Sequence, residues 1–381
     1  MIAVVIGLLA ALFGAQTAQP QPSAYVGSAA CARCHAAIYE RWKVTRMANV
    51  VRDPKIHPEA IIPDFSKPDP LLTFTKDQIA FVYGSKWKQR YFAKKGDDYV
   101  PLPATWDVTA RVWRPYAVQR PTSEACDGCH SVNYDVVTKT VTEWNVGCER
   151  CHGPGHDHVA GPMRANIVNP ARLDPVRAND ACIQCHSEGQ PLAAPAGRSF
   201  EWPVGFRMGL NLRDFWRLET NALGTQDTLH FSEGTGRENR MQGNDFVQSV
   251  MYTRGVTCFS CHDPHGSGNQ SELVKSTRLV CLTCHGPKSS NGPHTPTIET
   301  HTHHAAGSPG SECINCHMPA IQTVIGDAKV RSHTFKFIPP SDTGTLKVPN
   351  PCTTCHTDKS TAWAAAALRN WPEFSPWRVA R

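Results

Sequence analysis

The sequence is poor in three features. Beyond residues 2–13 it has few long apolar runs, and Pro and Gly, 30 and 27 of its 381 residues, interrupt the chain throughout. No charged side chain precedes Arg33, and no Cys lies outside one repeated five-residue motif. A chain of this length usually folds into two or three domains with apolar cores of their own. The scarcity of apolar runs therefore indicates that something other than side chains fills much of the core.

The repeated motif is C-x-x-C-H, which occurs eight times and uses all 16 cysteines. Chance placement at this content of Cys and His would supply about 0.03 copies. The motif is the signature of covalent c-type haem attachment, because two thiols three residues apart can form thioethers to the two vinyl groups of one haem. The next residue then places its imidazole under the iron as the proximal ligand.

Two other uses of paired cysteines explain the pattern less well. Zinc sites also use C-x-x-C but have no need of a His directly after each second Cys, and a disulfide framework needs no His. We therefore predict eight covalently bound haem c groups. The thioether cysteines are Cys31, Cys34, Cys126, Cys129, Cys148, Cys151, Cys182, Cys185, Cys258, Cys261, Cys281, Cys284, Cys313, Cys316, Cys352 and Cys355, and the proximal ligands are His35, His130, His152, His186, His262, His285, His317 and His356.

About 45 residues per haem leave little chain for an independent core, so the porphyrins should form much of it. The predicted fold is that of a multihaem cytochrome c, with mostly irregular loops and short α-helices packed around a chain of eight haems. The formal net charge of +6 becomes about −2 with ferric and about −10 with ferrous iron once ionised propionates are counted. Charge therefore gives no reason to expect nucleic acid as a partner.

Residues 2–13 are apolar but too short to span a bilayer comfortably. They resemble the central part of a secretory signal peptide, so residues 1–20 are predicted to be a signal peptide, with an uncleaved N-terminal anchor as the alternative. No other transmembrane span is predicted. Because c-type haem is attached outside the cytoplasm, we expect an exported protein, in the periplasm or at the cell surface.

The stretch between the first and second motifs contains no Cys. Residues 78–92 are rich in aromatic and β-branched side chains, and a turn signal at 94–98 follows them, which predicts a small β-hairpin insertion near residues 78–102. Lys86, Lys88 and Arg90 alternate along this segment and should share one strand face. A solvated face is the simpler interpretation, and a docking patch for an acidic redox partner is the alternative.

The spacing of the motifs suggests an internal duplication. First cysteines at 126, 148 and 182 are 22 and 34 residues apart, and those at 258, 281 and 313 are 23 and 32 apart. Ser360 followed by 361–371 reads as a capped helix that ends before Pro372. The predicted segments are 21–120 with the first haem and the hairpin, 121–205 and 206–320 with three haems each, and 321–381 with the eighth haem and the C-terminal helix.

The second axial ligands decide between electron transfer and catalysis, because a bis-His haem is saturated and an open iron can bind substrate. Ten of the 18 His lie outside the motifs, which is enough for eight irons. The tract at 301–304 could also be an adventitious metal site, and an isolated His is more often a surface or core residue. The predicted distal ligands are His57, His158, His230, His265, His301, His304 and His333.

Four stretches carry a family resemblance: 148–158 (CERCHGPGHDH), 258–265 (CFSCHDPH), 313–319 (CINCHMP) and 350–359 (NPCTTCHTDK). They resemble the multihaem cytochromes c that include the tetrahaem acceptor of hydroxylamine oxidation and related extracellular cytochromes, over about residues 25–371. The resemblance implies bis-His haems in alternating stacked and angled pairs, with His158 as a distal ligand and His156 spare.

The sequence departs from this family after Trp42, where relatives often carry a distal His and residues 43–48 here read KVTRMA. The sixth ligand of the first haem is thus open between His57, Met47, a His of another subunit, or none.

The function that these observations favour is electron transfer along closely packed, mostly bis-His haems, with other redox proteins as donor and acceptor. Self-assembly into a conductive homopolymer is a further hypothesis. The alternative is an octahaem oxidoreductase that acts on small nitrogen or sulfur compounds at one open haem. No C-x-x-C-K variant is present to support it, and the uncertain first haem is the reason to keep it.

Overall fold

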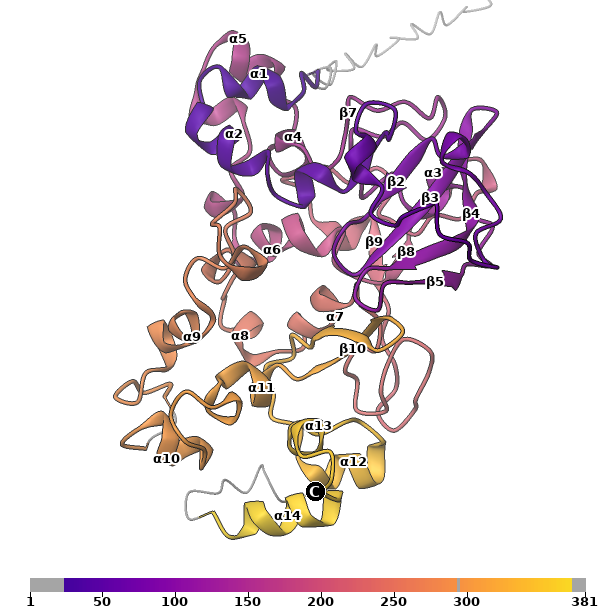
Figure 1. The fold of residues 1–381 in the computed structure, drawn as a ribbon. Helices are drawn as coiled ribbons and strands as arrows, with labels where there is room; N and C mark the ends of the chain where they lie inside the picture. The colour runs from indigo at the N-terminus through magenta and orange to yellow at the C-terminus, as the bar shows by residue number, and fades with distance from the viewer. Residues whose placement is uncertain (1–23, 293–294, 372–381) are drawn as a thin grey trace, which may run out of the picture.

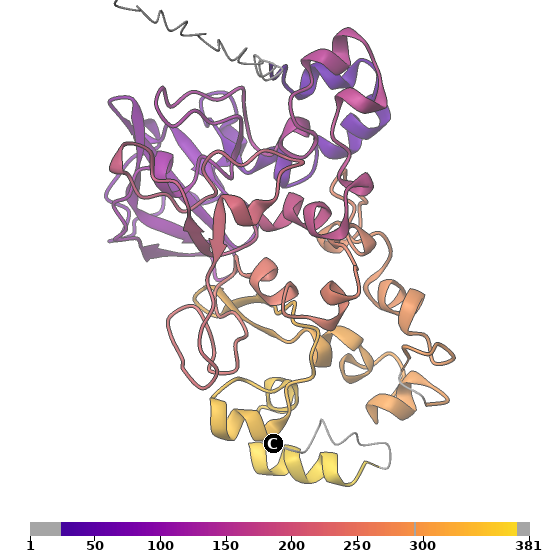
Figure 2. The ribbon, with the colours of Figure 1, turned by 180° about the vertical axis from the view of Figure 1, so that it is seen from behind.

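The computed structural model describes residues 24–292 and 295–371 (Figure 1). The predicted signal peptide, residues 1–20, lies outside the described residues. The first helices, α1 (Ser28–Ala32) and α2 (Ala36–Trp42), lie at one end of the molecule, and α14 (Thr361–Arg369) lies at the other. The view from behind shows the same arrangement (Figure 2).

A five-stranded antiparallel sheet follows the first motif, in the order β1-β2-β3-β4-β5. Its central hairpin pairs β3 with β4, with Lys95 opposite Asp98, so the predicted turn at 94–98 is confirmed. The predicted extent was wrong, because the hairpin at 78–102 is only the middle of a sheet that runs from residue 51 to residue 115. Two-residue and four-residue edge strands carry no detectable period in a sequence. The strands are β1 (Val51–Arg52), β2 (Phe81–Tyr83), β3 (Lys88–Lys95), β4 (Asp98–Asp107) and β5 (Val112–Pro115).

One face of this sheet has an aromatic core of its own. Ile79, Tyr91 and Trp113 are buried there, and Phe65 packs edge-on against the last two. The other face lies toward the rest of the chain. Lys88 and Arg90 are half-buried on it, so the prediction of a solvated face was wrong for them. The ammonium group of Lys88 donates to a carbonyl 236 residues further along the chain, at 3.3 Å.

The remaining described residues form short helices joined by long loops, as predicted, together with three two-stranded ribbons that were not predicted. The longest helices have nine residues, and helices this short are stable only when packed. The ribbons are β6 (Ser131–Val132) with β7 (Glu143–Trp144), β8 (Gly189–Pro191) with β9 (Trp216–Leu218), and β10 (Ala320–Ile325) with β11 (Ala328–Arg331). The further helices are α3 (Thr122–Ala125), α4 (Cys148–His152), α5 (His156–Ala160), α6 (Pro175–Ile183), α7 (Gln242–Phe246), α8 (Val250–Thr253), α9 (Thr277–His285), α10 (Ile298–Thr302), α11 (Cys313–His317), α12 (Pro340–Leu346) and α13 (Pro351–Cys355).

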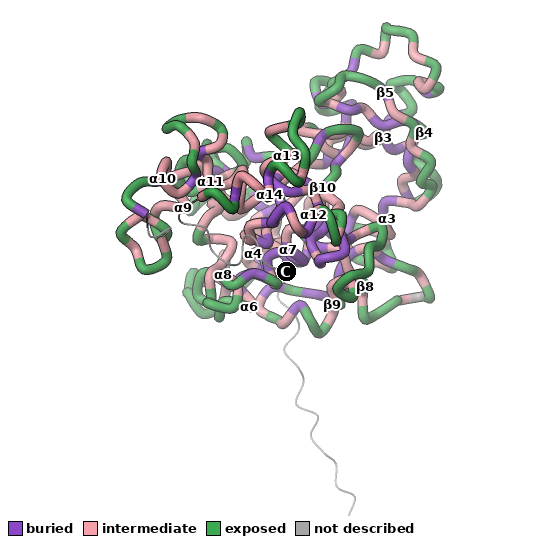
Figure 3. The backbone as a smooth tube through the Cα atoms, turned by 90° about the horizontal axis from the view of Figure 1, so that it is seen from below, coloured by how far each residue is buried: buried purple, intermediate pink, exposed green. Residues whose placement is uncertain are grey.

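Buried residues are unevenly distributed among these helices (Figure 3). Four of the five residues of α7 are buried, whereas α9 and α11, which carry the sixth and seventh motifs, have no buried residue. The predicted C-terminal helix is confirmed: the Ser360 side chain accepts a hydrogen bond from the Trp363 N–H at 3.1 Å, and α14 ends at Arg369. Within the described ranges, no helix combines the length and apolarity that crossing a membrane requires.

Candidate functional site

Each C-x-x-C-H motif is folded as one tight turn. In five motifs the N–H of the His donates to the carbonyl of the first Cys, at 2.8 to 3.1 Å, which closes one helical turn. This turn brings both thiols and the imidazole to one side of the backbone. All 16 cysteines are free thiols. Their geometry therefore fits thioether attachment of a porphyrin, with the imidazole beside it.

The motifs contact one another in three groups. Helices α1 and α4 pack together, so that the thiol of Cys31 reaches Cys148 of the third motif and lowers the pKa of Cys148 to about 7. The Cys129 thiol of the second motif lies 3.8 Å from the carbonyl oxygen of Gln184 in the fourth. Cys182 contacts Cys258 of the fifth motif. Further along, α9 packs on α11 and α11 on α13, which joins the sixth, seventh and eighth motifs.

Five motif histidines face a second imidazole at a distance that suits an iron between them. An iron held by two imidazole nitrogens at about 2.0 Å, each roughly 1.1 Å from its ring centre, sets the two centroids about 6.2 Å apart. This exceeds the contact distance of stacked rings. The centroid separations are 6.4 Å for His35 and His158, 6.1 Å for His152 and His265, 6.5 Å for His262 and His333, 6.4 Å for His317 and His301, and 6.1 Å for His356 and His304.

Five of the ten paired imidazoles place their δ nitrogen at hydrogen-bonding distance from a backbone carbonyl oxygen. His152 Nδ1 lies 2.9 Å from the carbonyl oxygen of Val168, and His333 Nδ1 lies 3.0 Å from that of Arg331. His158, His262 and His304 also place Nδ1 against backbone carbonyl oxygens. A hydrogen bond at Nδ1 fixes the ring orientation and leaves Nε2 free for a metal. The donor set thus fits haem iron.

The other predicted distal ligands, His57 and His230, lie in contrasting environments. His57 is half exposed and faces Glu59 at 3.4 Å, which is the surface role that an isolated His more often has. His230 is fully buried, with Nδ1 at 3.2 Å from both carboxylate oxygens of Asp227. Its Nε2 is buried without a hydrogen-bond partner, as expected of a nitrogen that binds a metal.

Among the described residues, His130, His186 and His285 have no imidazole ring paired with theirs. His294, which follows the sixth motif, lies outside the described residues. His156 is exposed beside Asp157, and His303 stacks on Trp371 with centroids 4.3 Å apart. No group of three or more His, Cys, Asp or Glu in the described ranges could hold an additional metal ion.

His130, in the second motif, has surroundings of its own. The ring of Tyr83 lies 5.3 Å from it, too close for an iron in between, and the Tyr83 hydroxyl donates to Asp127 at 2.8 Å. Burial, then Arg240 and Arg90, lower the pKa of His130 to about 4. The sequence did not indicate Tyr83 or Arg240 as neighbours, because both lie far from the motif along the chain.

Two protein families match parts of the chain. The doubled CXXCH motif matches residues 252–290, and the family described as cytochrome c554 and c-prime matches residues 86–153. With eight motifs folded for attachment and imidazoles paired around them, these matches decide the class. The protein is a multihaem c-type cytochrome. Its cofactor is covalently bound haem c, and the predicted resemblance is confirmed.

Solved structures show which fold this cytochrome has. The outer cell wall cytochrome OcwA superposes with a TM-score of 0.76 at 23% identity, over 91% of this chain and 86% of that one. The undecahaem cytochrome from the S-layer of Carboxydothermus ferrireducens gives a TM-score of 0.54 at 19% identity, over 92% of this chain and 61% of that one. The cytochrome therefore has a multihaem cytochrome fold like that of OcwA.

A curated relative bears the name of an enzyme. The dissimilatory sulfite reductase MccA of Wolinella succinogenes is 22% identical over 327 residues. The match covers 64% of this cytochrome, which spans 42% of the length of that relative.

Proposed function

We propose that this cytochrome is an exported octahaem protein that transfers electrons along its chain of haem sites. The observation that carries the proposal is the set of five imidazole pairs with centroids 6.1 to 6.5 Å apart. Pairs of this kind saturate the iron and leave no position for a substrate. When bound, each haem supplies a one-electron iron couple.

The five ring pairs support the following assignment of distal ligands. His158, His265, His333, His301 and His304 are the distal ligands of the first, third, fifth, seventh and eighth sites, in that order. We add His230 to these five as a further distal ligand, because its Nε2 is buried and has no hydrogen-bond partner. The geometry does not tie it to one motif. For the first site this assignment favours His158 over His57 and Met47.

The contacts between motifs support three segments of an electron-transfer route. Contacts join the first motif to the third, the second to the fourth, the fourth to the fifth, and the sixth through the seventh to the eighth. The first and eighth motifs lie near opposite ends of the molecule (Figure 1). We propose that redox partners, or further copies of this chain in a filament, exchange electrons at these ends. The names of OcwA and of the S-layer cytochrome support a location outside the cell.

Film voltammetry of the haem-loaded full chain tests the proposal. We expect reversible signals whose integrated charge corresponds to eight electrons per chain and which nitrite or sulfite leaves unchanged. A charge equal to one or two electrons would mean that the haems do not communicate, and the electron-transfer proposal would be wrong.

A second candidate function is reduction of a small oxyanion at the second motif, and the environment of His130 favours it. No imidazole in the described part of the chain pairs with His130, and the guanidinium groups of Arg90 and of Arg240, which is itself paired with Glu188, lie close enough to lower its pKa. The guanidinium of Arg90 lies 4.4 Å above the ring of Tyr116, and its Nε is buried without a partner. The relative named as a sulfite reductase is compatible with this function. Sulfite-dependent or nitrite-dependent oxidation of the reduced protein would support it, and its loss in Arg90→Gln would locate it.

A further inference from the structure

The carboxylate of Glu149, in the third motif, holds together two segments that carry the imidazoles of the first site. Glu149 lies on α4 and is 2% exposed. One carboxylate oxygen accepts a hydrogen bond from the Gly27 N–H at 2.7 Å, and the other accepts one from the Gly155 N–H at 2.7 Å. The Val26 N–H is shared between the two oxygens, at 3.0 and 3.1 Å. A single side chain therefore bridges residues 26–27 and residue 155.

Each of these segments leads directly to a proposed ligand of the first iron. Gly27 is the N-cap residue of α1, which contains Cys31 of the first motif and precedes the proximal His35. Gly155 is the N-cap residue of α5, which contains the distal His158. The Glu149 carboxylate thus lies between the starts of the two segments that present these imidazoles.

Glycine at both contact points lets the carboxylate approach the backbone closely. Gly27 has a φ of +79°, in the left-handed region that favours glycine. A Cβ at Gly155 would lie 3.1 Å from a carboxylate oxygen of Glu149 and 3.3 Å from the Val26 side chain, which is tighter than an ordinary contact. Beside this bridge, the His156 N–H donates to the carbonyl of residue 24 at 3.1 Å. The two segments are therefore packed directly on each other.

A different side chain, Asn166, fixes the ring of His158. Its carbonyl oxygen lies 3.1 Å from His158 Nδ1, and its NH₂ group donates to the carbonyls of Asp157 and Gly161 at 3.0 and 2.8 Å. These bonds orient the imidazole within its own loop. The distance of this loop from His35 depends instead on contacts between the two segments, and the Glu149 bridge is one of them.

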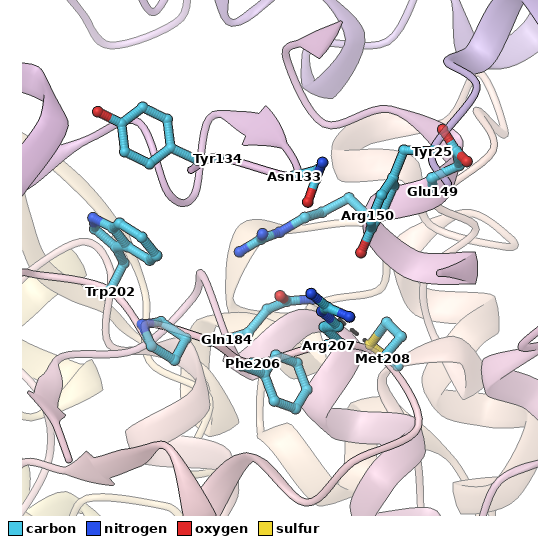
Figure 4. Close-up of a pocket in the computed structure, with 12 residues that line it drawn as sticks. Tyr25, Asn133, Tyr134, Glu149, Arg150, Gln184, Trp202, Phe206, Arg207 and Met208 are labelled. Atoms are coloured by element: carbon cyan, nitrogen blue, oxygen red, sulfur yellow. Dashed lines mark hydrogen bonds between the residues drawn. The ribbon is translucent and has the colours of Figure 1, made fainter. Parts of the chain in front are cut away.

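The contacts of Glu149 are made by the chain itself. Its charge is met by three N–H groups, of which the successive pair from Val26 and Gly27 is an arrangement that binds anions. Figure 4 shows the carboxylate beside Tyr25 and turned away from the guanidinium group of Arg150. The charge and the contacts of Glu149 are therefore accounted for without a haem.

We propose that Glu149 is the positioning residue of the first iron, because its carboxylate sets the separation of the His35 and His158 rings, whose centroids lie 6.4 Å apart. This inference rests on the proposed function, in which His158 binds the first iron. An imidazole that is already held at the right distance loses less freedom when it binds the metal. Glu149 therefore strengthens the bond of His158 to the iron against competing external ligands.

Titration of the reduced, haem-loaded full chain with carbon monoxide tests the proposal, because CO binds a bis-His haem only where it displaces the distal imidazole. His158→Ala should gain one CO site per chain over the wild type and so gives the absorbance change of the open first site. In Glu149→Gln an acceptor oxygen becomes an NH₂ group, which leaves an N–H of one segment without an acceptor. We expect CO affinity at the first site to rise at least about tenfold, as for one lost charge-assisted hydrogen bond. Glu149→Ala should raise it further.

The matched control is Asp107→Asn, in β4 of the sheet. Asp107 is 1% exposed and also accepts from two backbone N–H groups, those of Thr109 and Ala110, at 3.1 and 2.9 Å. Its replacement should lower thermal stability but leave CO binding at the first site like that of the wild type. Haem content is measured for every variant. Glu149→Gln is close to the wild type in size and decides the test if Glu149→Ala takes up fewer than eight haems.

Three outcomes would overturn the proposal. If His158→Ala gains a CO site but both Glu149 variants bind CO like the wild type, the role of Glu149 is wrong and the electron-transfer proposal stands. If His158→Ala gains no CO site, the ligand assignment of the first iron is wrong, and the role of Glu149 with it. An equal rise in CO affinity in Asp107→Asn would show that loss of stability alone opens the site.

Discussion

The imidazole rings of His35 and His158 lie with their centroids 6.4 Å apart and their planes within 12° of parallel. His35 belongs to the first motif, and His158 follows the third. The pairing closes the first motif onto the third across the whole sheet insertion, and the packing of α1 on α4 supports it. The proposed ligation of the first iron would therefore couple to chain folding at this end of the molecule.

Replacing His158 should open one iron. In His158→Ala the first site would lose its distal nitrogen, and we expect one low-spin ferric signal to be replaced by a high-spin signal in the EPR spectrum. The control is His156→Ala, two residues away, which removes an exposed imidazole beside Asp157 and should leave the spectrum unchanged. An unchanged spectrum in His158→Ala would contradict the assignment.

Asp227 should increase electron donation from the His230 imidazole to an iron bound at its Nε2. Its carboxylate lies 3.2 Å from His230 Nδ1 and would make the imidazole a stronger donor to ferric iron. We expect Asp227→Asn to raise the midpoint potential of one haem, measured by spectroelectrochemical titration. Identical potentials in variant and wild type would show that His230 binds no iron.

Gly128 should tolerate no side chain. A Cβ at this position would lie 1.8 Å from the ring of Trp202, so Gly128→Ala must displace that ring. We expect a loss of about 1–3 kcal/mol in the free energy of unfolding, as for other overpacked sites, and a lower yield of protein with a full haem content. The control is Gly344→Ala in α12, where nothing lies within 4 Å and Ala favours a helix. Equal thermal stability of the two variants would be inconsistent with the observed packing.

The ion pair of Asp98 and Lys139 should make stability pH-dependent. Burial alone would raise the pKa of Asp98, but hydrogen bonds from Lys139 (2.8 Å) and Ser123 (2.6 Å) hold it below its ordinary 3.8. A carboxyl with a lowered folded-state pKa stabilises the fold above about pH 4, and this contribution is lost as pH falls through the folded-state pKa. Asp98→Asn should cost about 2 kcal/mol at pH 7.

Thermal melts of wild type and Asp98→Asn, from pH 7 down to pH 3, check this expectation. The difference between the two proteins should shrink below pH 4. A difference that stays constant over this range would show that the carboxylate charge contributes nothing. Lys139→Met should reproduce the loss at pH 7, because the pKa of Lys139 is raised mainly by its hydrogen bond to Asp98.

The sequence predicted those features that depend only on residues close together in the chain, namely the haem-attachment motifs and the C-terminal helix. Attachment depends on five consecutive residues, so the motifs were identified without a structure. The helix at 361–369 follows from Ser360 and a run of Ala. The edge strands β1 and β5 were missed, because strands of two and four residues carry no period.

Pairings between distant residues could not be derived from the sequence in the same way. The count of His residues predicted enough distal ligands, but nothing in the sequence places His333 opposite His262. The burial of Lys88 and Arg90 was missed for the same reason. Their alternation indicates a strand face, whereas Lys88 contacts a segment 236 positions further along the chain and Arg90 stacks on Tyr116.

The central claim is that most haem irons of this cytochrome are bound by two imidazoles. Low-temperature EPR of the fully oxidised, haem-loaded chain, quantified against total iron, tests it most directly. The account predicts that at least five of eight irons are low-spin and indifferent to nitrite and hydroxylamine. Any high-spin signal should come from the second motif. It should therefore be unchanged in His158→Lys, which alters the first site, and should change in Arg90→Gln. A spectrum dominated by high-spin iron that binds these ligands would contradict it.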